Sequence, residues 1–200
     1  VFISEPSAIT ISSSTTNVSC NGGNDGTATL TISGGTLPYT ESWLGNNPSA
    51  LAAGVYNYIV IDANGCSYNN FVTVTEPMQL NVTNSTTNVS CNGGNDGVAS
   101  LTLSGGTGTL SVNWGTANPN ALSVGTYSFT VTDSNSCTYT NSVTITEPQI
   151  ITATPNITNV SCLGGNDGMV TLTLSGGTGA LTADWGTANP NALSMGIYSF

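Results

Sequence analysis

The stretch Thr27-Ala-Thr-Leu-Thr-Ile32 alternates polar and apolar side chains, which is the pattern of a β-strand with one buried face. Two later segments repeat the alternation, with apolar residues at Ala99, Leu101 and Leu103 and at Val170, Leu172 and Leu174. A helix would instead place its apolar residues three or four positions apart. The pattern therefore predicts an all-β chain.

This strand belongs to a unit that recurs every 71 residues. The markers of the interval are Cys20, Cys91 and Cys162, then Trp43, Trp114 and Trp185, and the Glu-Pro pairs at 5–6, 76–77 and 147–148. Between 91–129 and 162–200, 29 of 39 aligned positions are identical, so the units are duplicates. The frame predicts the last strand of a preceding repeat at 1–6, repeat 1 at 7–77, repeat 2 at 78–148 and an incomplete repeat 3 at 149–200.

The extra strand expected at the start of the chain and the missing strand in the third repeat have two possible explanations. Val1–Ser4 aligns with Val72–Thr75, and the third repeat has no counterpart of the strand around Val143 and Ile145. A window from a longer array explains both observations and is favoured, because near-identical arrays usually contain many copies. In the alternative, Val1–Ser4 completes the third repeat of a neighbouring molecule, as in donor-strand assembly.

Further strands are expected on both sides of Thr27–Ile32. The candidates are Ile9–Ile11, Tyr39–Leu44, a short piece near Leu51, Val55–Ile61 and Phe71–Val74, separated by turns rich in Gly, Asn, Asp and Pro. Six or seven short strands in about 70 residues favour tandem immunoglobulin-like β-sandwiches. Because the linkers are short and contain Pro, the repeats are expected to form a semi-rigid rod.

Two aromatic positions in each unit mark the expected core. A sandwich of this type buries a Trp in mid-strand, and a Tyr that opens the penultimate strand closes a corner through its hydroxyl group. The candidates are Trp43, Trp114 and Trp185, and Tyr56, Tyr127 and Tyr198. Exposed Trp rings would instead indicate a stacking platform for sugars.

The charge composition excludes several classes of partner. The chain has no Lys, Arg or His and ten acidic residues, which give a formal charge of −10. Nucleic acid and anionic lipid are both recognised through cations, so neither is an expected partner. No apolar run reaches the length of a membrane span, and no membrane insertion is expected.

The chain resembles the SprB-type repeat of giant surface adhesins of gliding Bacteroidota. The residues that carry the resemblance are Asn17-Val-Ser-Cys-Asn-Gly-Gly-Asn-Asp-Gly26, the following strand and Ser-Gly-Gly turn, Asp62-Ala-Asn-Gly-Cys66 and Val72-Thr-Val-Thr-Glu-Pro77. The resemblance implies a bacterial cell-surface array that is exported by the type IX route and carried along the cell during gliding. Leu163, which replaces the Asn of the first two copies, is a departure from this pattern.

The five cysteines are expected to form disulfides, since an exported chain meets an oxidising environment. Pairing within a repeat would join Cys20 to Cys66 and Cys91 to Cys137. In a regular sandwich, however, the first turn and the last hairpin lie about 25 Å apart, and a disulfide needs Cα atoms within about 7 Å. Pairing between repeats would join Cys20 to Cys137 and leave Cys91 and Cys162 with partners outside the chain. Both schemes remain open, and free thiols are the remaining alternative.

Eight of the ten carboxylates recur with the repeat. We expect Asp25 and Asp62 to shape tight turns and Glu76 to precede the linker at Pro77. The alternative is weak calcium binding by oxygen ligands. Its candidate ligands are Asn24, Asp25, Asp62, Asn95, Asp96 and Asp133. No other cofactor is expected.

Three classes of function are compatible with a tandem array of this kind. The first is a structural stalk of an extracellular adhesin or filament, in contact with neighbouring repeats and able to bundle. The second is a module that binds glycan or a surface by avidity. The third is an enzyme, which the sequence disfavours because no copy supplies a His, Lys or Arg to tune a carboxylate pair.

Overall fold

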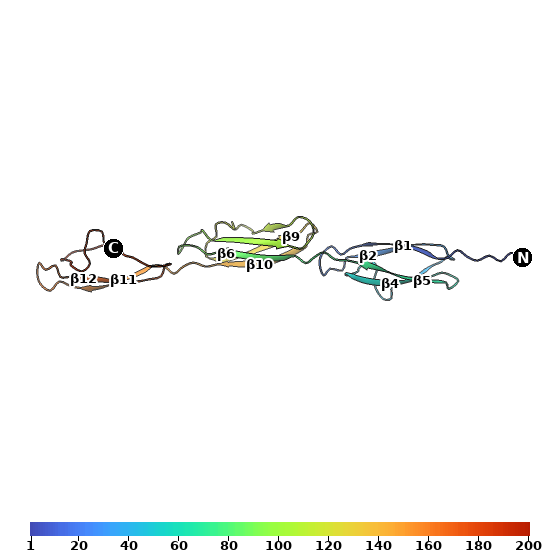
Figure 1. Ribbon diagram of the computed structural model, residues 1–200, viewed down its shortest axis with the longest axis horizontal. Helices are drawn as coiled ribbons and strands as arrows, with labels where there is room; N and C mark the ends of the chain where they lie inside the picture. The colour runs from blue at the N-terminus through green and yellow to red at the C-terminus, as the bar shows by residue number, and fades with distance from the viewer. The chain divides into compact units, whose positions relative to one another are not determined.

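A computed structural model describes residues Val1 to Phe200, and every regular element in it is a β-strand, which confirms the predicted all-β class (Figure 1). No helix in it is suited to cross a membrane. The strands are β1 (Thr10–Thr16), β2 (Thr27–Ser33), β3 (Thr40–Ser42), β4 (Gly54–Ile61), β5 (Ser67–Val74), β6 (Asn81–Thr87), β7 (Val98–Ser104), β8 (Ser111–Asn113), β9 (Gly125–Thr132), β10 (Thr138–Ile145), β11 (Thr152–Thr158) and β12 (Met169–Ser175).

The chain folds into two compact units. Unit 1 comprises Val1–Thr83, Leu101–Asn113 and Phe129–Asn141, and unit 2 comprises Asn84–Ser100, Trp114–Ser128 and Ser142–Phe200. Unit 1 therefore contains the whole of repeat 1 together with the hairpin that joins β9 to β10. The repeat boundaries at 77 and 148 stay predictions.

Repeat 1 consists of two antiparallel sheets, β1-β2 and β3-β4-β5, with β1 and β2 packed over β5 (Figure 1). An isolated bridge between Gly26 and Leu51 continues the first sheet. This order corresponds to strands A, B and E facing C, F and G of an immunoglobulin-type sandwich. The later sheets β6-β7, β8-β9-β10 and β11-β12 repeat it, with bridges Gly97–Leu122 and Gly168–Leu193.

β1 is longer than the sequence predicts. Apolar alternation is limited to Ile9 and Ile11, and Ser12–Thr16 carries only hydroxyl side chains. These residues pair with β2 in register, and hydroxyl groups meet across the strands at 2.7 Å in the pairs Thr10–Ser33, Ser14–Thr29 and Thr16–Thr27. Cross-strand hydroxyl bonds of this kind stabilise a strand that hydrophobic periodicity does not reveal.

The core of repeat 1 lies between its two sheets. Val60 is 0% exposed and Tyr58 2% exposed, and the ring of Trp43, 8% exposed, lies 5.4 Å from that of Tyr58. Trp43 is thus a core residue, whereas Trp114 and Trp185 are half-buried. The tyrosine corner is present in each repeat, since hydroxyl groups donate to upstream carbonyl oxygens from Tyr56 to Ala52, Tyr127 to Ser123 and Tyr198 to Ser194.

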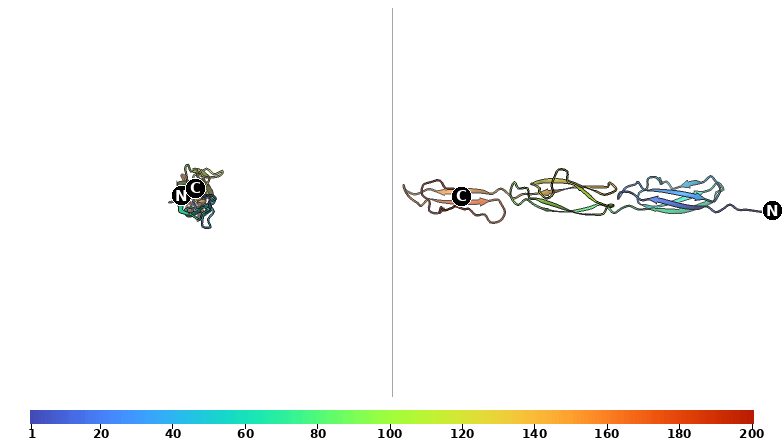
Figure 2. Two further views of the ribbon diagram at one scale, coloured as in Figure 1. Left: turned by 90° about the vertical axis from the view of Figure 1, so that its right-hand side faces the viewer. Right: turned by 90° about the horizontal axis from the view of Figure 1, so that it is seen from above.

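The N-terminal segment Val1–Pro6 forms no strand. Val1, Phe2 and Ile3 are each at least 90% exposed. Both Figure 1 and Figure 2 show the segment running away from β1 without a neighbour.

Shortening Val60 to Ala is expected to destabilise repeat 1 by about 2 kcal/mol, through lost apolar burial and the cavity left behind. The matched control is Val55→Ala in the same strand, where the side chain is 62% exposed. This control is expected to change stability by less than about 0.5 kcal/mol. Hydrogen exchange of the β4 and β5 amides measures both effects, and equal effects of the two substitutions would contradict the assigned core.

Candidate functional site

The loop Asn17–Gly26 is closed by its own polar groups. The carboxylate of Asp25 accepts a hydrogen bond from the Ser19 N–H at 3.0 Å and another from the Ser19 hydroxyl group. The Gly23 N–H donates to the carbonyl oxygen of Cys20 at 3.0 Å. Gly22 has a φ of +75°, which a residue without a Cβ adopts without strain. Asp25 therefore shapes this turn.

The same bonds affect the acidity of Asp25. The Ser19 hydroxyl group and then the Ser19 N–H stabilise the ionised carboxylate, which holds the pKa of Asp25 below its ordinary value. Asp96 with Ser90 and Asp167 with Ser161 repeat the arrangement, and the pKa of each Asp is lowered for the same reason. The bond between Asp and Ser is thus the same in all three loops.

The loop is fastened to the exit of its own repeat. Thr75 donates its N–H to the Asn17 side chain at 3.1 Å and accepts the Val18 N–H at 3.0 Å. The Gly22 N–H donates to the Glu76 carboxylate at 2.6 Å, and the Asn21 amide donates to the Pro77 carbonyl oxygen at 3.1 Å. We call this set of four hydrogen bonds the exit latch.

Repeat 2 forms the same exit latch inside unit 2. The latch joins Asn88 and Val89 to Thr146, Gly93 to Glu147, and Asn92 to Pro148. The sequence places Glu76 before the linker but does not reveal its bond to the loop. The signal in the sequence is that both Glu-Pro and Asn-Gly-Gly recur every 71 residues. This recurrence does not indicate that the two motifs bind each other.

The hairpin after the penultimate strand contains a buried carboxylate. Asp62 is 5% exposed and accepts backbone N–H bonds from Thr36, Asn64 and Cys66 at 2.9–3.0 Å. Burial acts to raise its pKa, but the three N–H donors outweigh burial and hold the pKa of Asp62 below its ordinary value. No cation is needed to neutralise the group, which suits a chain without Lys or Arg.

Asp133 occupies the equivalent place between β9 and β10. It is 6% exposed and accepts N–H bonds from Thr107, Asn135 and Cys137 at 2.8–2.9 Å. Burial again opposes these donors, which prevail and lower the pKa of Asp133. Each of the two hairpins is therefore stabilised by its own ionised Asp side chain.

Unit 1 brings the first loop of repeat 1 against this second hairpin. Cys20 and Cys137 form a disulfide, with Cα atoms 5.6 Å apart and 117 residues between them in sequence. The Asn135 amide also donates to the Ser19 carbonyl oxygen at 2.9 Å. A cavity of 350 Å³ adjoins the bond and is lined by residues that include Asn21, Pro77, Leu80 and Asp133.

The structure thus resolves the two pairing schemes in favour of the bond between repeats. The pairings Cys20–Cys66 and Cys91–Cys137 do not form, because Cys20 and Cys137 are bonded to each other. Cys66, Cys91 and Cys162 are exposed free thiols. The physical reason is the sandwich order, which places the first loop and the last hairpin of one repeat at opposite ends.

The four Asp residues suggested as calcium ligands have other partners. Asp25 and Asp96 bind their own loops, and Asp62 and Asp133 bind three N–H groups each. Asn24 and Asn95 are exposed. No group of three or more acidic, His or Cys side chains is arranged to hold a metal ion. Calcium binding stays a prediction, which a comparison of melting temperature in excess calcium and in chelator tests.

Three segments of the chain match the SprB repeat, at residues 12–48, 83–114 and 154–185. Each match runs from the first strand of a repeat, through the loop that corresponds to Asn17–Gly26, to the Trp or just beyond it. Together the matches cover about half of the chain. The chain belongs to the SprB repeat family. This is a family of structural repeats from cell-surface adhesins and not an enzyme family. No curated protein and no solved structure matches the chain.

Replacing Cys20 by Ser is expected to destabilise unit 1 by about 2–4 kcal/mol, because the unfolded chain loses a long covalent loop. Cys66→Ser is the matched control and is expected to be neutral, since Cys66 is free and exposed. Denaturant titration measures both variants. Non-reducing peptide mapping of the parent chain checks the bond itself, and a linked peptide containing Cys20 and Cys66 would contradict it.

Acid is expected to destabilise the fold through Asp62 and Asp133. Their lowered pKa values mean that the unfolded chain binds more protons, so their contribution is complete above the ordinary Asp pKa of about 3.9 and is lost as pH falls through the folded pKa. The melting temperature should stay constant between pH 7 and pH 5, and it should decrease once the pH is lower than about 4.

The double variant Asp62→Asn, Asp133→Asn should melt lower at pH 7 and show a shallower loss in acid. Glu41→Gln, at an exposed position in β3, should leave the profile unchanged. A parent chain whose melting temperature stays constant down to pH 2 would exclude this role for the two Asp residues.

Proposed function

We propose that the chain is part of the stalk of a large adhesin on a bacterial cell surface, where its repeats carry tension between the cell and a distal binding region. Membership of the SprB repeat family supports this proposal. We further propose export by the type IX route, a role in attachment and gliding, and lateral bundling of neighbouring stalks. The proposal includes no catalytic step.

The observation that carries the proposal is the Cys20–Cys137 disulfide. The bond joins the first loop of repeat 1 to the last hairpin of repeat 2, across 117 residues of sequence. When a chain with such a bond is pulled from its ends, force passes through the disulfide and bypasses the residues between the two cysteines. The enclosed strands are then protected from extension even if they unfold.

Force spectroscopy on the 200-residue chain, held by its ends with the free thiols alkylated, tests this protection. The oxidised chain is expected to release about 40 nm less contour length than the reduced chain, because each of the 117 residues contributes ~3.5 Å when extended.

Cys20→Ser provides the control and should give the long extension with or without reductant. Equal contour lengths for the oxidised and reduced parent chain would exclude the protective role.

A second candidate function is direct binding of neutral polysaccharide. The outward face of β1 and β2 presents hydroxyl side chains alone, at Thr10, Ser12, Ser14, Thr16, Thr27, Thr29, Thr31 and Ser33. The absence of charge on this face favours an uncharged, hydroxylated ligand over an ionic one. Such contacts are individually weak and would act by avidity along many repeats.

Retention of the chain on immobilised neutral polysaccharide, and loss of retention on replacing Ser12, Ser14, Thr29 and Thr31 by Ala, would support binding. The control set places Ala at the exposed β5 positions Ser67, Asn69 and Thr73. If the parent chain is not retained even when it is displayed in many copies on beads, direct polysaccharide binding is excluded. The stalk is then the remaining function of the two.

A further inference from the structure

The outward side of the sheet β3-β4-β5 in repeat 1 carries a cluster of apolar side chains. We call this cluster the β4-β5 face, and its residues are Val55, Ile59, Ile61 and Phe71. Val55 is 62% exposed, Phe71 56% and Ile61 39%, whereas Ile59 is half-buried. Along the strands these residues alternate with the core residues Tyr58, Val60 and Val72. The sheet therefore has one apolar side in the core and a second one in solvent.

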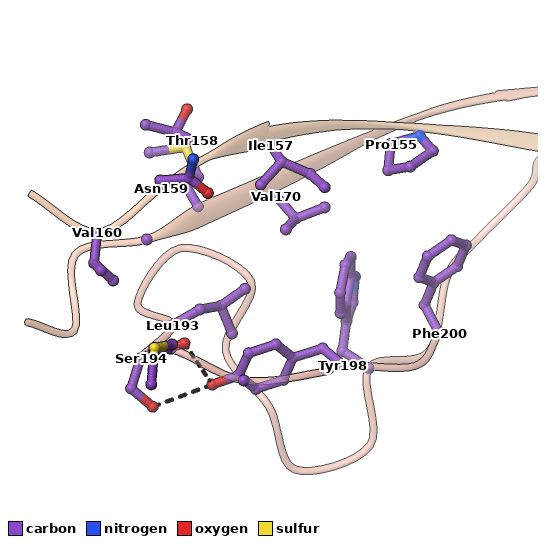
Figure 3. Close-up of a pocket in the computed structure, with 15 residues that line it drawn as sticks. Pro155, Ile157, Thr158, Asn159, Val160, Val170, Leu193, Ser194, Tyr198 and Phe200 are labelled. Atoms are coloured by element: carbon purple, nitrogen blue, oxygen red, sulfur yellow. Dashed lines mark hydrogen bonds between the residues drawn. The ribbon is translucent and has the colours of Figure 1, made fainter. Parts of the chain in front are cut away.

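The tyrosine corner fixes the side of the sheet on which this face begins. Tyr56 donates its hydroxyl group to the Ala52 carbonyl oxygen at 3.0 Å, and Figure 3 shows the same bond for the equivalent pair Tyr198 and Ser194. Successive side chains of a strand point to opposite faces of the sheet. Val55 therefore lies on the side away from Tyr56, where it is exposed to solvent.

Strand pairing brings the side chains of the face together. Asn57 lies opposite Phe71, and Ile59 lies opposite Asn69. Phe71 is therefore diagonal to both Val55 and Ile59, a separation of about 7–8 Å that an aromatic side chain can span. The β4-β5 face is thus a continuous apolar surface that contains two amide groups.

Repeat 2 has the same sheet with a hydroxyl surface in place of the apolar one. The residues equivalent to those of the β4-β5 face are Thr126, Thr130, Thr132 and Ser142. They are exposed or half-buried, although the hairpin of repeat 2 is bonded to repeat 1 through Cys137. Hydroxyl contacts cross the strands at 3.1 Å between Thr130 and Thr140. The fold of a repeat therefore does not require apolar residues at these positions.

Leu44 adds a further exposed apolar side chain two residues after Ser42, which pairs with Ile59. Leu44 is 58% exposed and has a φ of +55°, which costs a residue with a Cβ roughly 1–2 kcal/mol. The equivalent residues are Gly115 and Gly186, with φ of +63° and +59°. Backbone strain of this kind is retained where a side chain has a role beyond the fold. A contact made by the Leu44 side chain explains the residue better than the turn does.

The β4-β5 face carries no charge, in a chain whose charged side chains are all acidic. Glu41 is the one acid in the three strands, and it lies opposite the buried Val60 and hence on the other side of β3. Surfaces that present carboxylates repel each other in two copies of this chain, whereas two β4-β5 faces meet without opposing charges. The hydroxyl face of β1 and β2 is also uncharged, but removing its hydroxyl groups from water gains less than removing apolar groups.

A second copy of the chain also matches the polar groups and the size of the face. Asn57 and Asn69 each carry an amide that both donates and accepts, so the same groups of a second copy can pair with them. The three strands cover roughly 25 Å by 10–14 Å. Two such faces bury less than the roughly 1,200 Å² of a stable complex. The area therefore predicts a weak and reversible contact, which many parallel copies would strengthen.

We propose that the β4-β5 face of repeat 1 binds the same face of a second copy of this chain, in a weak side-by-side dimer. Phe71 is the central aromatic anchor, and Val55 and Ile59 surround it. The pairing is isologous, because both copies use the same surface. This inference rests on the proposed function, since it names the surface through which neighbouring stalks would bundle.

Sedimentation equilibrium of the 200-residue chain up to millimolar concentration, with its free thiols alkylated, tests the proposal. The parent chain is expected to show a monomer–dimer equilibrium. High salt should tighten the dimer, because screening reduces repulsion between the acids and leaves the apolar contact in place. A parent chain that is monomeric at all concentrations, in low and in high salt, would overturn the proposal.

The triple variant Val55→Thr, Ile59→Thr, Phe71→Ser installs the residues that repeat 2 has at these positions. It should weaken dimerisation at least about tenfold, because the apolar anchor is lost. Its melting temperature should stay close to that of the parent, since repeat 2 folds with the same residues. Val112→Thr with Val124→Thr is the matched control, because these valines are 38% and 48% exposed and lie outside the face. The control should dimerise like the parent.

The reverse exchange adds a second apolar face. Thr126→Val, Thr130→Ile, Ser142→Phe transfers the three residues to repeat 2, and association should become stronger because each chain then offers two faces. Dimerisation that persists unchanged in the first triple variant would overturn the proposal, since another surface would then be responsible. Protection from extension is a property of single chains. Failure of the stalk function in force spectroscopy and failure of this dimer in sedimentation are therefore separate results.

Discussion

Each complete repeat depends on the contact between the end of its last strand and its first loop. These two segments lie more than 50 residues apart, so joining them costs chain entropy that only a specific contact recovers. Val74 fills the space left by the missing side chain of Gly26, Thr75 pairs with Asn17 and Val18, and the Glu76 carboxylate takes the Gly22 N–H. The motif Asn-Val-Ser-Cys-Asn-Gly-Gly-Asn-Asp-Gly is therefore best understood as the receptor for a strand end, and its glycines serve close approach and turning.

Much of the fold follows from local sequence patterns, because alternation, turn residues and the Gly-x-Tyr corner act over a few residues. β2 and β4 are found close to their predicted positions for this reason. β1 extends beyond its apolar residues, because hydroxyl pairs with β2 take over there. The exit latch and the choice of disulfide partner could not be obtained in the same way. Both depend on which loops and strand ends meet after the sheets have formed. The spacing of the cysteines along the sequence is compatible with two pairings, and only the strand order distinguishes them.

The residues with well-defined roles gather in the connecting loops, and the sheet faces are chemically simple. The loop at Cys20 is shaped by Asp25, fastened by Glu76 and bonded to the hairpin that Asp133 organises. The outward face of β1 and β2, by contrast, is a regular array of hydroxyl groups. The specific contacts of such a repeat are therefore made by its loops. The chain in which these loops occur belongs to the SprB repeat family.

The buried carboxylates of Asp62 and Asp133 also bear on the conditions in which the protein can remain folded. Each negative charge is balanced by three short N–H contacts and not by a cation, and the chain contains no Lys or Arg to form ion pairs. Dissolved ions screen charges separated by more than about 10 Å far more than they disturb such short dipolar contacts. High ionic strength would therefore relieve repulsion among the surface acids while leaving the hairpins intact. We therefore expect the stability of the fold to change little over a wide range of salt concentration.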